Sequence, residues 1–380
     1  MDWIPFNKPY LTGNELSYVQ DAVREGKISS NGKYTQLCQN FFQKRYKFGK
    51  CFLTTSCTDA LEMATLLISI KPGDEVILPS YTFVSTANAF ALRGAKLIFV
   101  DSRKDHPGID EDKIEDLITN KTKVIVPVHY GGVACDMDKI MALAAKYQLI
   151  VVEDAAHAID SFYIGKDGVK KALGSIGHFA TFSFHETKNI TSGEGGMLVI
   201  NDSQYLNRAE IIWEKGTNRS SLFRQEVKKY EWLDLGSSYA PSEILAAFLW
   251  AQLENLQDIQ KVRLNHWNTY YEKFENWAFE KKINLPIQLQ YTTRNGHMFY
   301  LVLKSENQRQ KIIDRLKEKN ILAVFHYLSL HKSPFFNSKH DGRILPEADR
   351  YSENLLRLPF YYTLSKNEIQ HITEIVKTQF

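Results

Sequence analysis

One lysine follows directly after an apolar segment that has the composition of a buried strand. The segment runs from Phe179 to Phe184, and the polar turn behind it contains Lys188 before a glycine-rich stretch at 193–196. A lysine held at the end of a strand can form a Schiff base with a carbonyl group of a cofactor or substrate. An ordinary surface lysine in a loop is the alternative, and Lys188 alone does not decide between them.

An acidic residue ends a second apolar segment. Val151 and Val152 lead into Glu153 and Asp154, after which the chain becomes small and polar. A carboxylate buried at the end of a strand requires a cationic partner, which a protonated pyridine nitrogen would provide. The alternative is that Asp154 caps the start of a helix.

Two further segments carry groups that suit a phosphorylated aromatic ligand. The run from Thr55 to Thr58 precedes a helical pattern, and hydroxyls and free N–H groups at a helix start bind anions. The same run also fits a simple N-cap. Tyr81 to Phe83 follows an expected strand, where an aromatic side chain either stacks on a flat ring or packs in the core.

Taken together, these segments match the requirements of pyridoxal 5'-phosphate (PLP). The cofactor needs a phosphate cup, an aromatic neighbour for its ring, a carboxylate for its ring nitrogen and a lysine for its aldehyde. The chain supplies them in that order, ending with Asp154 and then Lys188. The combination is far more specific than any of its parts and predicts PLP as the cofactor.

The elements that must position these groups alternate between strands and helices, which predicts an α/β fold with a large, mostly parallel sheet wrapped by helices. Active sites of such sheets lie beyond the carboxyl ends of the strands. The later chain predicts a smaller α+β domain, with the division at 1–255 and 256–380. Expected strands are 51–54, 75–79, 96–101, 124–128, 149–154, 179–184, 197–200, 297–303 and 323–326; expected helices include 14–25, 34–46, 59–67, 82–93, 111–118, 138–147, 206–215, 243–258, 260–278, 307–317, 348–356 and 366–380.

Composition excludes several other classes of protein. The chain has 380 residues, 44% of them hydrophobic and 24% charged, with a net charge of +3, which is too small to predict nucleic-acid binding. Its four cysteines have no metal-ligand spacing, so we expect reduced thiols and no metal. Neither a signal peptide nor a segment of transmembrane length is visible. We therefore expect a cytoplasmic protein without a membrane anchor.

The sequence resembles the DegT-type nucleotide-sugar aminotransferases, which are fold-type I PLP enzymes, over nearly its whole length. Within that family it is most similar to the branch that makes dTDP-4-amino-4,6-dideoxygalactose. The family motifs are IPFN at 4–7, KPGDEVI at 71–77, PSYTFVSTAN at 79–88, VEDAA at 152–156, SFHETKN at 183–189 and RLP at 357–359; VPVHY at 126–130 and EKGTNRS at 214–220 are close to the branch.

The resemblance implies roles for the residues around the cofactor. Lys188 binds PLP and moves the proton, and Asp154 keeps the ring nitrogen protonated. Phe83 stacks on the ring, and His157 lies near the ring hydroxyl, where the family more often has Gln. Many relatives bind the phosphate with an Asn from the partner subunit, but this chain and its branch lack it, with Ala240 at the position. The phosphate is bound by Ser56, Cys57, Thr58 and Ser183.

Family analogy also implies contacts with the sugar nucleotide. The basic members suit a diphosphate through charge-assisted hydrogen bonds. Solvated surface charge is the alternative for this group. By contrast, His297 and Tyr300 are interpreted as structural. The implied substrate-binding residues are Tyr10, Lys27, Lys215, Arg219, His326, Tyr327 and His331.

The connection at 217–239 is long and rich in aromatic residues and arginine, which is the composition of interface cores and rims. Together with the resemblance, it predicts a homodimer with shared active sites. The implied reaction moves the amino group of L-glutamate to C4 of a dTDP-4-keto-6-deoxy sugar. Alternatives are an equatorial C4 amine, a 3-keto substrate and a UDP carrier.

Two rivals come from other classes. One is a PLP-dependent sugar dehydratase of the same fold, but relatives of that kind replace the lysine with histidine. The other is a non-catalytic sensor that keeps the fold, against which the pair Asp154 and Lys188 argues.

Overall fold

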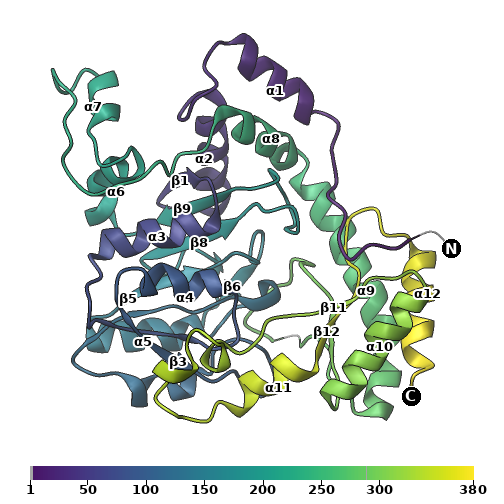
Figure 1. The fold of residues 1–380 in the computed structure, drawn as a ribbon. Coiled ribbons are helices and arrows are strands. Elements are labelled where there is room, and N and C mark those ends of the chain that lie inside the picture. The colour runs from purple at the N-terminus through teal and green to yellow at the C-terminus, as the bar shows by residue number, and fades with distance from the viewer. Residues whose placement is uncertain (1–2, 288) are drawn as a thin grey trace.

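The computed structural model describes residues 3–287 and 289–380, so Met1 and Asp2, the start of the segment that lacks signal-peptide features, lie outside it. A seven-stranded sheet dominates the fold (Figure 1). Its strand order is β1 (Lys50–Thr54), β9 (Gly196–Ile200), β8 (Phe179–Ser183), β5 (Ile150–Asp154), β4 (Thr122–Ile125), β2 (Glu75–Pro79) and β3 (Lys96–Val100).

Most of this sheet is parallel. β9 runs antiparallel to both β1 and β8, while β8, β5, β4, β2 and β3 pair in parallel. The strands are buried on both faces, because Val151 belongs to one core cluster and its neighbour Val152 belongs to the other. The predicted α/β architecture is therefore confirmed, and parallel pairing brings the ends of β5 and β8 to the same edge.

Helices cover both faces of the large sheet. Two of them, α3 and α4, begin near the edge of the sheet where β5 and β8 end, and their first turns contribute to the site. The bounds of the helices are α1 (Glu15–Arg24), α2 (Lys33–Tyr46), α3 (Cys57–Ile68), α4 (Val84–Ala91), α5 (Met137–Tyr147), α6 (Leu206–Trp213), α7 (Arg219–Phe223) and α8 (Glu243–Glu254).

A second, smaller sheet lies beside the first (Figure 1). Its order is β10 (Tyr300–Val302), β12 (Leu355–Arg357) and β11 (Val324–Phe325), and a hairpin of β6 (Phe162–Ile164) and β7 (Lys170–Ala172) stands apart. The sheet and its helices come from residues after 255, in keeping with the proposed division at 1–255 and 256–380, which stays a prediction. These helices are α9 (Leu256–Lys281), α10 (Glu306–Glu318), α11 (Pro346–Asn354) and α12 (Lys366–Lys377).

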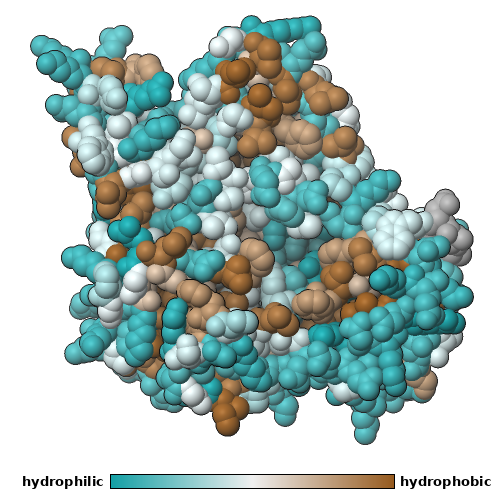
Figure 2. All heavy atoms as spheres, in the orientation of Figure 1, coloured by the Kyte–Doolittle hydropathy of each residue, from teal (hydrophilic) through white to brown (hydrophobic). Residues whose placement is uncertain are grey.

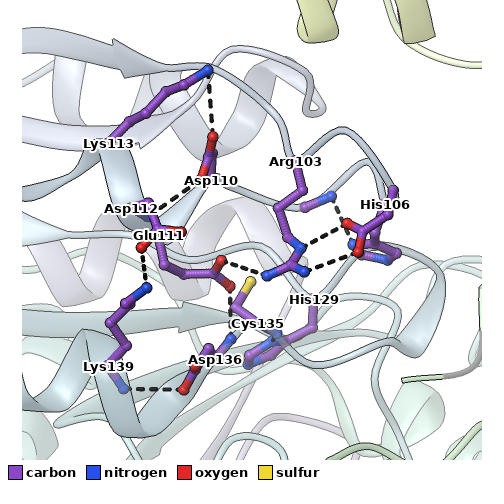
Figure 3. Close-up of polar contacts among 12 residues, drawn as sticks. Arg103, His106, Asp110, Glu111, Asp112, Lys113, His129, Cys135, Asp136 and Lys139 are labelled. Atoms are coloured by element: carbon purple, nitrogen blue, oxygen red, sulfur yellow. Dashed lines mark hydrogen bonds and ion pairs between the residues drawn. The ribbon is translucent and has the colours of Figure 1, made fainter. Parts of the chain in front are cut away.

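The expected helix at 111–118 is wrong. The structure has two short 3-10 turns there, Glu111–Lys113 and Glu115–Leu117. In Figure 3 the side chain of the buried Glu111 points toward Arg103 and Asp136. It accepts hydrogen bonds from the backbone N–H of Asp136 at 2.7 Å and from Arg103 at 3.1 Å. These bonds hold the segment in tight turns against α5.

One other segment differs from expectation in its type of structure. The expected helix at 348–356 ends at Asn354, and residues Leu355–Arg357 form β12 instead. The neighbours decide this, since β12 pairs with β10 on one side and with β11 on the other. The long connection at 217–239 contains the short helix α7. Among the helices of the described residues, none is long and apolar enough to cross a membrane.

Candidate active site

A cavity of about 590 Å³ opens at the carboxyl ends of β5 and β8. Groups from the second sheet close its other side, among them His326 and Tyr327. The cavity brings together every residue that the sequence assigned to the cofactor: Ser56, Cys57, Thr58, Phe83, Asp154, His157, Ser183 and Lys188.

Lys188 lies in the turn that follows β8. Its backbone N–H donates to the carbonyl of His185 at 2.9 Å, which fixes the turn. Burial lowers the pKa of the Lys188 amine to about 8, and the positive charge of Arg357 acts in the same direction. A larger fraction of the amine is therefore unprotonated near neutral pH than for an exposed lysine, and the unprotonated amine is the nucleophile.

Asp154 ends β5 inside the cavity and is only 5% exposed. Its Oδ2 accepts a hydrogen bond from the Thr86 hydroxyl at 2.7 Å, and its Oδ1 accepts one from the backbone N–H of Ala156 at 3.1 Å. No lysine, arginine or histidine nitrogen among the described residues lies within 4.0 Å of this carboxylate. A buried carboxylate without a cation fits a protonated ring nitrogen, as PLP would provide.

The start of α3 forms the anion-binding end of the cavity. Ser56 is the N-cap, with its Oγ accepting from the Asp59 N–H at 3.0 Å, and the hydroxyls of Thr58 and Ser85 bond at 2.8 Å. Gly196 of β9 lies against this turn so closely that a Cβ there would stand 2.3 Å from the Ser56 carbonyl carbon. The bare backbone leaves the helix start accessible, and the site fits a phosphate.

The Ser56 hydroxyl is already engaged, because it also donates to the Asp59 carboxylate at 2.9 Å. The groups best placed for a phosphate are therefore the first backbone N–H groups of α3, with the side chains of Thr58 and Ser183. The Cys57 thiol also lines the cavity, and burial raises its pKa, so it remains a neutral thiol.

His157 lies on the wall of the cavity and its ring stacks on His297 with centroids 4.3 Å apart. Its Nδ1 accepts from the Gly131 N–H at 3.3 Å, so the proton of the neutral ring is assigned to Nε2, which lies 3.4 Å from the Tyr327 hydroxyl. Burial lowers the pKa of His157 well below its usual value. The side chain is therefore a neutral donor.

Phe83 is the N-cap residue of α4 and is 55% exposed, although it lines the cavity. Its ring faces that of Tyr327 with centroids 6.0 Å apart. Tyr81, the other aromatic in this segment, is buried and donates from its hydroxyl to the His326 carbonyl, outside the cavity lining. Of the two aromatic residues in this segment, Phe83 is therefore the one that lines the cavity and can stack on a ring.

Of the residues assigned to the sugar nucleotide, His326 and Tyr327 line the cavity. Tyr327 has a φ of 51°, a left-handed conformation that is uncommon for an aromatic residue and that occurs at functional sites. His326 is held by a hydrogen bond between its Nδ1 and the Tyr130 hydroxyl at 2.8 Å.

The other five residues lie elsewhere in the single chain. Lys27 and Arg219 line a second cavity of about 590 Å³, and Lys215 lies beside it at the end of α6. The ring of Tyr10 stacks on Tyr362 with centroids 3.7 Å apart.

His331 is buried within its own chain. Its Nδ1 bonds to the Ser80 hydroxyl at 2.7 Å, and its Nε2 lies 3.6 Å from the Asp349 carboxylate. Its predicted substrate contact therefore has no support in the structure of one chain.

Sequence reasoning missed several residues of the cavity, three of which matter for its charges and hydrogen bonds. Thr86 and Arg357 both lie within quoted motifs but were given no role, and His297 was interpreted as structural although it lines the cavity. The strand ending at Asp154 gave no sign of Thr86 as its partner, because that contact joins residues 68 positions apart.

The comparisons with known proteins agree with this site. The profile of the DegT/DnrJ/EryC1/StrS aminotransferase family matches residues 9–377. GDP-perosamine synthase of Escherichia coli is 32% identical, with 99% of this chain and 98% of the relative covered. The spore coat polysaccharide biosynthesis protein SpsC of Bacillus subtilis is 30% identical, with 99% and 96% covered.

Solved structures give the same result. A protein of Streptococcus pneumoniae described as a sugar aminotransferase superposes in its PLP form with a TM-score of 0.90 at 26% identity, covering 100% of this chain and 98% of the other. Its PMP form gives the same TM-score at 27% identity, with 100% and 98% covered.

Proposed function

Because the chain belongs to the DegT/DnrJ/EryC1/StrS aminotransferase family, whose solved relatives hold PLP and PMP, we propose that this PLP-dependent sugar aminotransferase uses L-glutamate to aminate C4 of dTDP-4-keto-6-deoxy-D-glucose. The products are dTDP-4-amino-4,6-dideoxy-D-galactose and 2-oxoglutarate. The observation that carries the proposal is the position of Lys188 and Asp154 in one cavity, with the start of α3 at its anion-binding end.

Two residues carry the chemistry in this proposal. Lys188 would hold the cofactor through its aldehyde, and its amine would move a proton at the substrate carbon. Its lowered pKa, about 8, leaves the amine able to accept that proton. Asp154 holds the proton of the ring nitrogen. When bound, PLP supplies an electron sink for the negative charge that develops at the substrate carbon.

The remaining cofactor residues orient the ring. The N–H groups at the start of α3, with Thr58 and Ser183, bind the phosphate. The Nε2–H of His157 donates to the ring hydroxyl oxygen, replacing the glutamine that is more frequent in the family. Phe83 stacks on the ring, and its 55% exposure in a single chain falls when the ring is bound.

We propose that the active protein is a homodimer with shared sites. In one chain, Arg219 lies outside the cofactor cavity, in a segment whose aromatic side chains are exposed, with Phe223 at 70% and Trp232 at 77%. A second apolar area lies over α1 and α8, where Leu16 is 77% exposed (Figure 2). Exposed aromatic and apolar groups of this kind mark interfaces. In the dimer, Arg219 and Lys215 bind the diphosphate in the partner's site.

One relative favours a second candidate substrate. Because GDP-perosamine synthase is 32% identical over nearly the whole chain, a GDP-linked keto sugar is the alternative acceptor. With that acceptor, the same cavity would set the configuration of the new amine at C4.

The direct test uses purified, PLP-loaded protein with L-glutamate and dTDP-4-keto-6-deoxy-D-glucose. We expect NMR of the product to show an axial amine at C4. A parallel reaction offers the GDP-linked keto sugar. Turnover of the GDP sugar alone contradicts the dTDP assignment, and an equatorial amine contradicts the galactose configuration.

The shared site is tested by mixing two inactive variants, Lys188→Ala and Arg219→Ala. A mixed dimer holds one site with both defects and one with neither, so the mixture is expected to recover part of the activity. A mixture that stays inactive despite proven chain exchange shows that Arg219 does not act in the partner's site.

A further inference from the structure

One cation in the cofactor cavity has no part in the roles above. Arg357 is the last residue of β12, the central strand of the small sheet, where it pairs with Tyr300 on one side and with Val324 on the other. Its side chain lines the same cavity as Lys188 and Asp154. Strand pairing on both sides thus holds the backbone of Arg357, and its side chain lies at the cavity wall.

Arg357 lacks the hydrogen-bond partners that the buried Arg263 has. Arg263 donates to the carbonyls of Gly296 and His297 at 3.0 and 2.7 Å. The Nε of Arg357 is buried without a hydrogen-bond partner, and no carboxylate of the described chain lies within 4.0 Å of its guanidinium. An interior guanidinium without a counter-charge is unfavourable, so the wall is suited to an anionic ligand.

The second support of Arg357 is a ring. The guanidinium lies over Phe6 with 4.6 Å to the ring centroid, which orients the planar group without neutralising it. A hydrogen bond holds Phe6 in this position, since its carbonyl accepts from the Phe360 N–H at 3.1 Å. The N-terminal segment therefore packs against the cavity wall.

The titratable groups around Arg357 do not compensate its charge. Burial lowers the pKa values of His157, His297 and His326 well below the usual range, and Arg357 contributes to each shift. Burial also raises the pKa of Tyr327 well above its usual value, so this phenol stays neutral. Asp154 is engaged by Thr86 and by the backbone of Ala156. The wall near Arg357 is therefore net positive.

Four anionic groups enter this cavity if the proposed function holds: the cofactor phosphate, the sugar diphosphate and the two carboxylates of the amino donor. The cofactor phosphate has its own cup at the start of α3. The diphosphate is attached to C1 of the sugar, across the ring from C4, and so is remote from the reacting carbon. In L-glutamate the γ-carboxylate is separated by two methylene groups from the carbon that carries the reacting amine, whereas the α-carboxylate is bonded directly to that carbon. Arg357 lines the same cavity as the Lys188 amine, and its positive charge helps to lower the pKa of that amine.

We propose that Arg357 binds the α-carboxylate of L-glutamate, an inference that rests on the proposed function. A planar guanidinium donates two parallel hydrogen bonds to a carboxylate, and lysine does not reproduce this geometry. Arg357 is thus a specificity-determining residue for the amino donor, and it discriminates against amines without a neighbouring carboxylate.

The test separates the two half-reactions. Wild type, Arg357→Gln and Arg357→Lys are loaded with PLP, and their conversion to the PMP form is followed by absorbance with L-glutamate and with L-isoglutamine, in which the α-carboxylate is an amide. The PMP forms are then returned to PLP with the keto sugar. Calorimetry measures binding of 2-oxoglutarate to each PMP form, and a thermal melt checks folding.

Arg294→Gln is the matched control. Its guanidinium also lies over an aromatic ring, 4.1 Å from the centroid of Trp267, and burial also lowers its pKa. Unlike Arg357, it does not line the cofactor cavity.

For Arg357→Gln we expect kcat/KM for L-glutamate to fall about a hundredfold or more, as when one partner of a buried charge pair is removed. Binding of 2-oxoglutarate weakens in parallel, and the preference for L-glutamate over L-isoglutamine is largely lost. Arg357→Lys restores only part of the rate. The keto-sugar half-reaction and the control variant stay close to wild type.

Two results overturn the inference while the proposed function stands: an Arg357→Gln variant that matches the control with L-glutamate, or one that loses the keto-sugar half-reaction instead. If another L-amino acid, and not glutamate, converts the wild-type PLP form to the PMP form, the assignment of glutamate as the donor is wrong. The inference about Arg357 then holds only if that conversion requires Arg357. A wild-type protein that no L-amino acid converts contradicts both the proposed function and the inference.

Discussion

Two polar regions at the large sheet differ in how their charges are satisfied. In the region shown in Figure 3, Arg103 pairs with Asp105 at 2.9 Å and with Glu111 at 3.1 Å, and Glu111 also accepts from the backbone of Asp136. In the cofactor cavity, Lys188 and Arg357 line the wall, and neither is within 4.0 Å of a carboxylate of the described residues. The charges of the first region are paired within the protein, whereas the cations of the second are free to pair with a ligand.

The same difference separates two adjacent residues of β5. Glu153 is fully buried, and its carboxylate accepts from three backbone N–H groups at 2.6–2.8 Å and from His129 at 2.9 Å. Asp154 points to the opposite face and accepts from only two donors. Strand alternation thus places a carboxylate that is satisfied within the protein next to one that lines the cavity and is proposed to bind the cofactor. Substitutions on each side of this comparison are expected to affect different properties.

The largest effect is expected for Lys188→Ala. Amino transfer is abolished, because no other amine lines the cavity within the described residues. The free energy of unfolding is expected to change by about 1 kcal/mol or less, since the residue lies in a turn and makes no side-chain hydrogen bond there. Steady-state assays and urea unfolding measure the two effects. Full activity in this variant contradicts the central assignment.

Asp154→Asn is expected to keep PLP bound but to slow the proton-transfer step by about a thousandfold or more. A neutral amide does not hold the proton of the ring nitrogen, so the electron sink weakens. Single-turnover absorbance with L-glutamate measures the rate, and equilibrium dialysis measures bound PLP. A rate near that of wild type would show that Asp154 only caps the strand end.

Glu153→Gln is expected to lower the stability of the protein and to leave the rate of proton transfer almost unchanged. The amide nitrogen of the glutamine would face backbone N–H groups that donate to the carboxylate of Glu153 in the wild type. The free energy of unfolding is therefore expected to fall by about 2 kcal/mol or more. Below its melting temperature, the folded variant keeps its single-turnover rate within about threefold of wild type, because the side chain does not line the cavity. A large loss of rate with unchanged stability would reverse the two roles.

The smallest effect concerns pH. Because burial lowers the pKa of Lys188 to about 8, covalent loading of the PLP-free protein should speed up as pH rises and level off above about 8. Arg357→Gln removes a positive charge that lowers this pKa, so its profile should move to higher pH. Stopped-flow absorbance after mixing with PLP gives both curves. Superimposable profiles would place Arg357 too far from Lys188 to act on it.

The sequence predicted the part of the site that depends on local pattern. Asp154 and Lys188 were found because apolar runs that alternate with helices mark parallel strands, and such strands end at one edge. Arg357 was not found as a site residue, because residues 348–356 have a continuous helical pattern. Only the pairing of β12 with β10 and β11, each distant in sequence, makes Leu355–Arg357 a strand that faces the cavity.

The positions of the residues assigned to the sugar nucleotide were also beyond local pattern. Lys27 and Arg219 lie near each other at a second cavity, although they are far apart in the sequence. No spacing rule predicts that arrangement, since α2, β1 and α7 come from distant parts of the chain and all contribute residues to this cavity.

Borohydride reduction of the PLP-loaded protein, followed by digestion and mass spectrometry of the peptides, tests the central claim most directly. Reduction fixes the cofactor to the amine that binds it, so the mass identifies that residue. We predict one pyridoxyl label per chain, on the peptide that contains Lys188, and none in Lys188→Ala. A label on another lysine, or no label on a chain that transfers amino groups, would contradict the account.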